Sequence, residues 1–164
     1  TVELPSLVEQ SVELVSPGLR QRITIDLDRS LYEVGPLPVP RVMLQQVFQN
    51  LVQNSAEAAR GTDGNRGHLG VSCVVERDER GNEMLTLRFT DDGVGIRDED
   101  LTRIFEKGFS TKSRDTNQGI GLHWCANAIN AIGGLMVAER APSGGAILFV
   151  TVPLKRAAAT ARAA

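Results

Sequence analysis

Three short segments of the sequence contain residue types that could bind a phosphorylated ligand. The first is Asn50–Ala58, which contains Asn50 and Asn54. Residues four apart are neighbours on one side of a helix, so both amides are expected beside the apolar stripe, looking into a cleft at the edge of the core. An amide oxygen is a suitable ligand for Mg²⁺ held by nucleotide phosphates. The alternative is two ordinary solvated asparagines.

The second segment is Asp91–Ile96, directly after the predicted strand that ends at Phe89 and Thr90. Carboxylates at the end of a strand, followed by Gly93 and Gly95, suggest a ligand that the backbone approaches closely. A carboxylate accepts hydrogen bonds from amine donors, such as the exocyclic amine of adenine. The alternative is a turn that uses Asp and Gly for backbone reasons.

The third segment, Gln118–Leu122, opens a predicted helix. Gly119 and Gly121 would let backbone amides reach phosphate oxygens at the helix N-terminus, although a plain helix entry would look the same. The sequence contains no G-x-x-x-x-G-K-[ST] motif, which argues against a P-loop enzyme. Gly93-Val94-Gly95 lacks the third glycine of a Rossmann fingerprint.

Apolar periodicity predicts the elements that must position these segments. The predicted helices are Pro5–Val15, Arg41–Arg60, a short helix over Asp98–Phe105, and Leu122–Ile132; the predicted strands are Ile23–Leu27, Leu69–Val75, Leu85–Phe89, Leu135–Glu139 and Ala146–Val152. Because hairpins are expected and strands gather late in the chain, we predict an α+β two-layer sandwich. One domain is predicted over residues 1–154, with a disordered Ala-rich tail over 155–164.

Composition excludes several classes of protein. The 164 residues carry a net charge of −2, so we expect no nucleic-acid partner and no direct membrane contact. The start, Thr1–Pro5, is no signal peptide and lacks an initiator Met, so we expect a fragment of a longer protein. Cys73 and Cys125 stand among apolar neighbours and are expected to be reduced thiols, which favours a cytoplasmic location.

The order and spacing of the three segments resemble the N, G1 and G2 boxes of the GHKL superfamily, which includes histidine kinases, gyrase, Hsp90 and MutL. Ile104–Lys112, between the second and third segments, resembles the F box of sensor histidine kinases. Gly133-Gly134 and Gly144-Gly145 also match that family, and the resemblance covers Leu4 to Leu154. It implies a Bergerat-type sandwich, a mixed sheet covered on one face by about three helices.

The resemblance also implies ATP and Mg²⁺ as ligands and assigns roles to residues. Asp91 would bind the adenine amine, with Gly93, Gly95 and Ile96 at the wall of its pocket. Asn54 would coordinate Mg²⁺, and Asn50 would help to bind the phosphates. The phosphates would be bracketed by Gly119, Ile120, Gly121 and Leu122, and Lys112 would contact them beside a lid over Ser113–Gln118. Phe105 and Phe109 would be packing residues that anchor the lid.

The function implied is the ATP-binding catalytic domain of a two-component sensor histidine kinase. Hydrolysing members of the superfamily carry glutamate at the position of Asn50, so its absence favours transfer to a protein over hydrolysis. Position 92 is Asp where many relatives have Asn. His68, expected in a loop, and His123, expected in a helix, lack a phosphoacceptor setting. The acceptor would lie on a dimerisation domain outside this chain.

A response regulator would act downstream, the parent protein could be membrane-anchored, and the fragment should be monomeric. The alternatives are a GHKL ATPase of the gyrase or MutL kind, a non-catalytic nucleotide-binding docking module, and a serine-kinase anti-sigma factor.

Overall fold

The computed structural model describes residues 1–60, 65–109 and 120–155. The predicted positions Lys112 and Gly119, the lid over Ser113–Gln118 and all but the first residue of the predicted tail lie outside these ranges. The elements in chain order are α1 (Leu4–Glu13), α2 (Pro17–Arg20), β1 (Ile23–Leu27), α3 (Ser30–Glu33), α4 (Arg41–Ala58), β2 (Gly67–Arg77), β3 (Glu83–Asp91), the 3₁₀ helices η1 (Asp98–Asp100) and η2 (Arg103–Phe105), α5 (Ile120–Ala131), β4 (Leu135–Arg140) and β5 (Ala146–Pro153).

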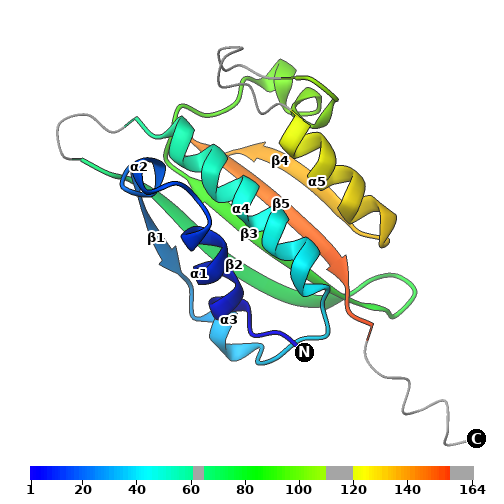
Figure 1. Cartoon of the computed structure of the whole chain (residues 1–164). Coiled ribbons are helices and arrows are strands. Elements are labelled where there is room, and N and C mark those ends of the chain that lie inside the picture. Colours follow the sequence, from blue (N-terminus) through cyan, green and yellow to red (C-terminus); the bar gives the residue numbers. More distant parts are fainter. Residues whose placement is uncertain (61–64, 110–119, 156–164) are drawn as a thin grey trace, which may run out of the picture.

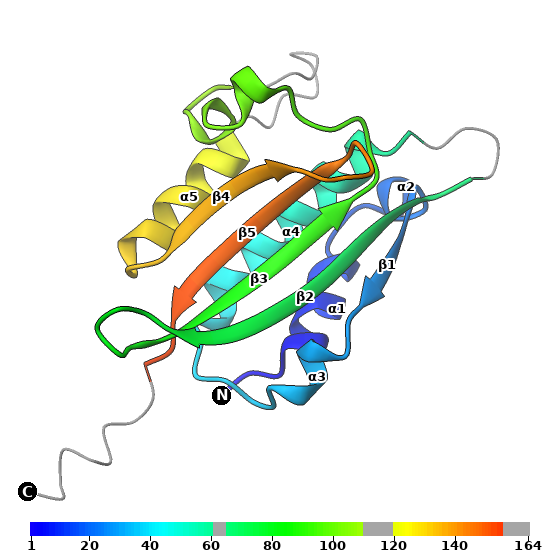
Figure 2. The same cartoon turned by 180° about the vertical axis from the view of Figure 1, so that it is seen from behind.

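The five strands form one mixed sheet in the order β1-β2-β3-β5-β4. β1 and β2 pair in parallel, which requires a long connection, and that connection contains α3 and α4. The other neighbouring pairs are antiparallel. The three long helices α1, α4 and α5 cover one face of the sheet, and Figure 2 shows its opposite face without them (Figures 1 and 2). The predicted α+β sandwich is confirmed.

The core lies between the sheet and α4, whose buried residues recur at helical spacing. Leu44, Val47, Phe48, Leu51 and Val52 are all buried. The rings of Phe48 and Phe89 on β3 pack with centroids 5.3 Å apart and planes tilted by 54°. This packing fixes the height of α4 above the end of β3, which sets the distance between the first two candidate segments.

The turn between β2 and β3 is closed by Asp78. Its Oδ1 accepts hydrogen bonds from the backbone N–H groups of Arg80 and Asn82, and Gly81 has a φ of +84°. These bonds hold the pKa of the Asp78 carboxyl below its ordinary value.

Within the described parts of the chain, no helix is both long and apolar enough to cross a membrane.

Two local predictions were wrong. His68 belongs to β2 rather than to a loop, because β1 pairs with the strand from Gly67 onward. The expected short helix over Asp98–Phe105 is instead two separate 3₁₀ turns. The 3₁₀ turn over Asp98–Asp100 is pinned by the buried Asp100, whose Oδ2 accepts a hydrogen bond from Arg97 Nε at 3.0 Å.

Candidate functional site

Asp91 is the last residue of β3, and its carboxylate is nearly buried, with 9% of the residue exposed. Oδ1 accepts two backbone hydrogen bonds, from Gly93 N at 2.9 Å and from Ala146 N at 3.1 Å. Within the described residues, the one contact that Oδ2 receives is a long one, from Ser55 Oγ on α4 at 3.4 Å. The two oxygens therefore differ: Oδ1 holds the surrounding backbone, and Oδ2 keeps capacity to accept a hydrogen bond from a bound molecule.

The glycines beside Asp91 allow backbone segments to touch. A Cβ at Gly93 would lie 2.5 Å from the carbonyl oxygen of Ala58, whose carbonyl also accepts a hydrogen bond from Val94 N at 3.0 Å. Gly95 has a φ of +79° and lies against the carbonyl of Gly144. The segment after β3 is thus held between the end of α4 and the turn before β5, with no space for side chains at these positions.

Asn50 and Asn54 lie one turn apart on α4, and both are half-buried. Asn50 Nδ2 donates a hydrogen bond to the carbonyl of Gln46 at 3.0 Å. Its Oδ1 faces the first turn of α5, where a Cβ at Gly121 would lie 2.5 Å away. A side chain at position 121 would displace the Asn50 amide, so in this structure the start of α5 lies directly against Asn50 and the first and third segments are adjacent.

Helix α4 is the common wall of the site. Ser55 and Ala58 contact the segment after β3, and Asn50 contacts the start of α5. Ile96 and Leu122 are partly buried against the core. For Ile120 the structure describes only its place as the first residue of α5.

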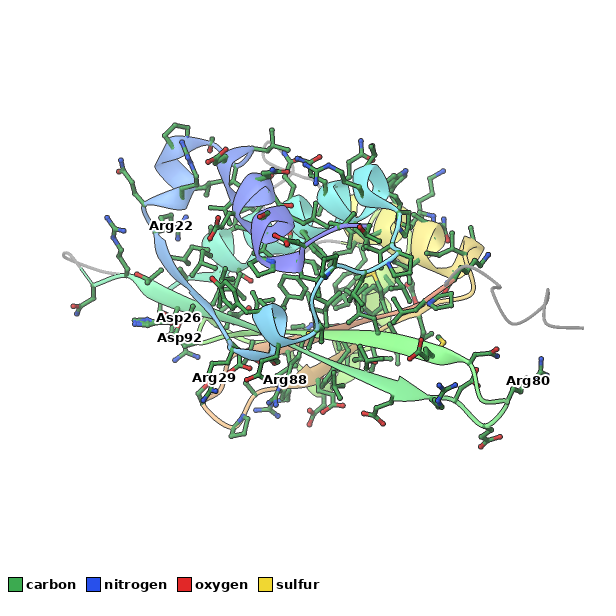
Figure 3. The ribbon with its side chains drawn as sticks, turned by 90° about the horizontal axis from the view of Figure 1, so that it is seen from below. Arg22, Asp26, Arg29, Arg80, Arg88 and Asp92 are labelled. Atoms are coloured by element: carbon green, nitrogen blue, oxygen red, sulfur yellow. The ribbon has the colours of Figure 1, made fainter. Side chains whose placement is uncertain are left out.

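Asp92 points away from this arrangement. It is exposed, and its Oδ1 accepts a hydrogen bond from His68 N on β2 at 2.8 Å. Figure 3, in which the helices lie above the sheet, shows Asp92 at the level of the strands, outside the helix layer. Its side-chain oxygen stabilises the start of β2.

Sequence reasoning missed two contributors to the site, Ser55 and Gly145. Ser55 falls on the apolar face of α4, where a buried hydroxyl needs a hydrogen-bond partner, and that partner is Asp91. Gly145 was noted only as part of the family resemblance, without a role in the site, but it lies directly against the backbone carbonyl of Asp91. A serine within an apolar stripe was the available sequence signal for Ser55, and only the family resemblance pointed to Gly145.

The cysteines are not part of the chemistry. Both are free thiols. Burial raises the pKa of Cys125 in α5 to about 12 and also raises the pKa of Cys73 in β2. Since the thiolate is the reactive form, neither thiol is activated as a nucleophile. Within the described ranges, no three His, Cys, Asp or Glu side chains gather as a metal-binding group.

The sandwich combines a buried carboxylate at a strand end, backbone packed closely through glycines, and a helix that begins beside the Asn50 amide, and these features together are typical of a nucleotide-binding domain. Residues 40–156 match the family described as histidine kinase-, DNA gyrase B- and HSP90-like ATPase, and the chain belongs to that family.

Among its relatives is the sensor protein FixL of Bradyrhizobium diazoefficiens. The two sequences are 34% identical over 151 residues, which is 92% of this chain and 28% of FixL. The chain thus spans little more than a quarter of that multidomain relative.

Solved structures share the fold. The catalytic domain of the histidine kinase ThkA superposes with a TM-score of 0.71 at 24% identity, over 93% of each chain. Full-length ShkA in complex with AMPPNP superposes with a TM-score of 0.69 at 23% identity, over 96% of this chain and 31% of ShkA. These likenesses agree with the sandwich and helix arrangement described above.

Proposed function

We propose that this chain is the ATP-binding catalytic domain of a sensor histidine kinase, which transfers the γ-phosphoryl group of ATP to a histidine on a dimerisation domain outside the chain. The observation that carries the proposal is Asp91, a buried carboxylate. One of its oxygens accepts two backbone hydrogen bonds, and within the described residues the other has one long hydroxyl contact. The relatives that are sensor kinases, and the AMPPNP bound by ShkA, support the same ligand class.

Adenine would bind at Asp91. The exocyclic amine would donate to Oδ2, and hypoxanthine or guanine would instead present an oxygen there, which a carboxylate repels. Gly93, Gly95 and Ile96 follow Asp91 directly and would form the pocket wall, with backbone close to the base.

The triphosphate would run along α4 towards α5. Ala58 and Asn50 are eight residues apart on α4, which is about 12 Å at 1.5 Å per residue, the scale of an extended nucleotide. Gly119, Ile120, Gly121 and Leu122 would offer backbone N–H groups and the positive end of the 12-residue α5 helix. Asn50, which faces Gly121, would contact the phosphates, and Lys112 would add a charge.

Mg²⁺ would be held by Asn54 together with the phosphates. The described residues offer no carboxylate cage, but Mg²⁺ commonly keeps several waters and takes one or two protein oxygens beside substrate phosphates. The close approach of Asn50 and Gly121, where a Cβ would fill the space, brings the amide-bearing side of α4 against the start of α5, so the residues present fit a phosphate-bound ion. When bound, the ion would neutralise charge on the phosphates.

Transfer rather than hydrolysis follows from Asn50. An amide cannot remove a proton from water, so α4 carries no general base at this position. In the transfer, a lone pair of the acceptor imidazole attacks the γ-phosphorus, an N–P bond forms, the bond to the bridging oxygen breaks and ADP leaves. The chain's own part is to orient the nucleotide and exclude water.

The proposal extends to partners and location. The acceptor domain would belong to the same parent protein, a response regulator would receive the phosphoryl group, and the fragment alone would be monomeric. Use of ATP and the two free thiols support a cytoplasmic setting.

The test is calorimetric titration of the 164-residue chain with ATP and with ITP, each with Mg²⁺. ITP differs from ATP by an oxygen in place of the amine, so it probes the contact with Asp91 directly. We expect saturable ATP binding and much weaker ITP binding. The matched control is Asp92→Asn, which changes a neighbouring carboxylate that faces β2. This variant should bind ATP as the wild type does. Equal affinities for ATP and ITP would refute the adenine assignment, and no binding of either would refute the function.

A further inference from the structure

His123 lies on the first half of α5 and contacts two groups with its two ring nitrogens. Nδ1 lies 3.1 Å from the carbonyl oxygen of Phe105, the last residue of η2. Nε2 lies 3.1 Å from Nδ2 of Asn127, one turn later on α5. The half-buried ring therefore bridges α5 and the segment that precedes residue 110.

The partners determine the protonation of the ring. A carbonyl oxygen can only accept, so Nδ1 must carry the hydrogen. In the neutral ring Nε2 is then the acceptor, and the amide nitrogen of Asn127 donates to it. Both contacts are satisfied by the neutral Nδ1–H tautomer, whereas the Nε2–H tautomer would place a lone pair against the carbonyl and two donors against each other.

The attachment matters because of what it holds. In the described ranges, no backbone N–H outside regular elements donates to the Phe105 carbonyl, so His123 is its hydrogen-bond donor. Phe105 and Phe109 are partly buried against the core, and Arg103 lies over the Phe109 ring at 5.1 Å. Apolar packing allows such a segment to slide, while one directed hydrogen bond fixes its register along α5.

The same end of α5 contacts the candidate nucleotide site. Gly121, two residues before His123, lies against Asn50 of α4. We propose that His123, held as the Nδ1–H tautomer by Asn127, is a positioning residue for the nucleotide. It fixes the Phe105–Phe109 segment to the turn of α5 that faces the phosphates. The inference rests on the proposed function, but the tautomer can be measured without any nucleotide.

The first experiment is ¹⁵N NMR of the imidazole rings in the 164-residue chain without nucleotide. The chain has two histidines, and His68→Asn removes the signals of the other one, an exposed residue on β2. The expected result is the Nδ1–H tautomer for His123, and Asn127→Leu should weaken that preference. A predominant Nε2–H tautomer in the wild type would overturn the proposal.

The second experiment compares three variants by ATP titration. His123→Asn places an amide nitrogen near the position of Nδ1, whereas His123→Gln reaches the position of Nε2 and His123→Ala has neither. We expect the Asn variant to keep the wild-type Kd, and the Gln and Ala variants to raise it roughly two- to tenfold, the effect of losing one neutral hydrogen bond.

A purely structural role would lower the unfolding temperature in the Gln and Ala variants with no change in Kd, and that result would overturn the proposal. So would equal Kd values for the Asn and Gln variants. If the wild type binds no ATP while His123 shows the Nδ1–H tautomer, the proposed function fails and the positioning role fails with it, although the attachment of Phe105 is established. The two failures are therefore distinguishable.

Discussion

Replacing Asp91 by Asn and by Ala should separate its two oxygens. Asp91→Asn keeps an oxygen for the N–H groups of Gly93 and Ala146, which require an acceptor, and it puts an NH₂ group where Oδ2 stands. Asp91→Ala removes both oxygens. The Asn variant should therefore lose ATP affinity while keeping the fold, and the Ala variant should lose both.

The magnitudes follow from the contacts. A buried donor without a partner costs about 1–3 kcal/mol, so two orphaned N–H groups should cost Asp91→Ala about 2–6 kcal/mol of unfolding free energy. That is a large share of the ~5–15 kcal/mol that stabilises a typical domain. A hydrogen bond to a charged group contributes about 1.5–3 kcal/mol, so Asp91→Asn should weaken ATP binding by roughly 10- to 150-fold.

The assay is urea unfolding together with titration by ATP and ITP. In Asp91→Asn the new NH₂ group can donate to the oxygen of ITP, so the preference for ATP should shrink or reverse. Asp92→Asn controls for the loss of one negative charge. The reasoning is refuted if Asp91→Asn binds ATP as tightly as the wild type, or if Asp91→Ala is no less stable than Asp91→Asn.

Two further predictions concern α5 and the thiols. Gly121→Ala should stabilise an Asn50→Ala background by up to about 1 kcal/mol through helix propensity, and it should be less favourable in the wild type, where the new Cβ must displace the Asn50 amide. A double-mutant cycle by urea unfolding tests this, and identical effects in both backgrounds would contradict the packing described. For the thiols, alkylation by iodoacetamide at several pH values should be faster in denatured chains as the pH rises through 9.0, the ordinary pKa of a thiol, while folded Cys125 stays protonated and unreactive and folded Cys73 reacts more slowly than when denatured. Rapid labelling of folded Cys125 would mean that its face of the helix is not buried.

The long elements could be predicted from the sequence because their patterns are local. Leu44, Phe48 and Leu51 mark one face of α4, and alternation in Leu85, Leu87 and Phe89 marks β3. The short helices α2 and α3 were not predicted. α3 begins after Asp28, whose Oδ2 accepts a hydrogen bond from Ser30 N, and such a turn carries little sequence signal.

Residue type and spacing indicate candidate residues for the site, but they do not indicate which contacts those residues make. Asp91, Gly93 and Gly121 were identified from type and spacing, and the structure brings Asp91 to Ser55 and Gly121 to Asn50. The partners could not be predicted because they depend on how far α4 and α5 approach each other, which is set by packing of distant residues. The prediction that His68 lies in a loop was wrong for the same reason, because pairing with β1 decides that this residue belongs to β2.

The position of Asn50 gives a physical reason for the absence of a glutamate there. Asn50 both donates to the Gln46 carbonyl and presents its oxygen to Gly121 across the contact of α4 with α5. A glutamate has no donor for that carbonyl and is longer by a methylene, so it would need more space at the point where α5 begins. The short amide of Asn50 therefore fits the close start of α5, and under the proposed function it leaves position 50 without a general base, which favours transfer of the phosphoryl group over its hydrolysis.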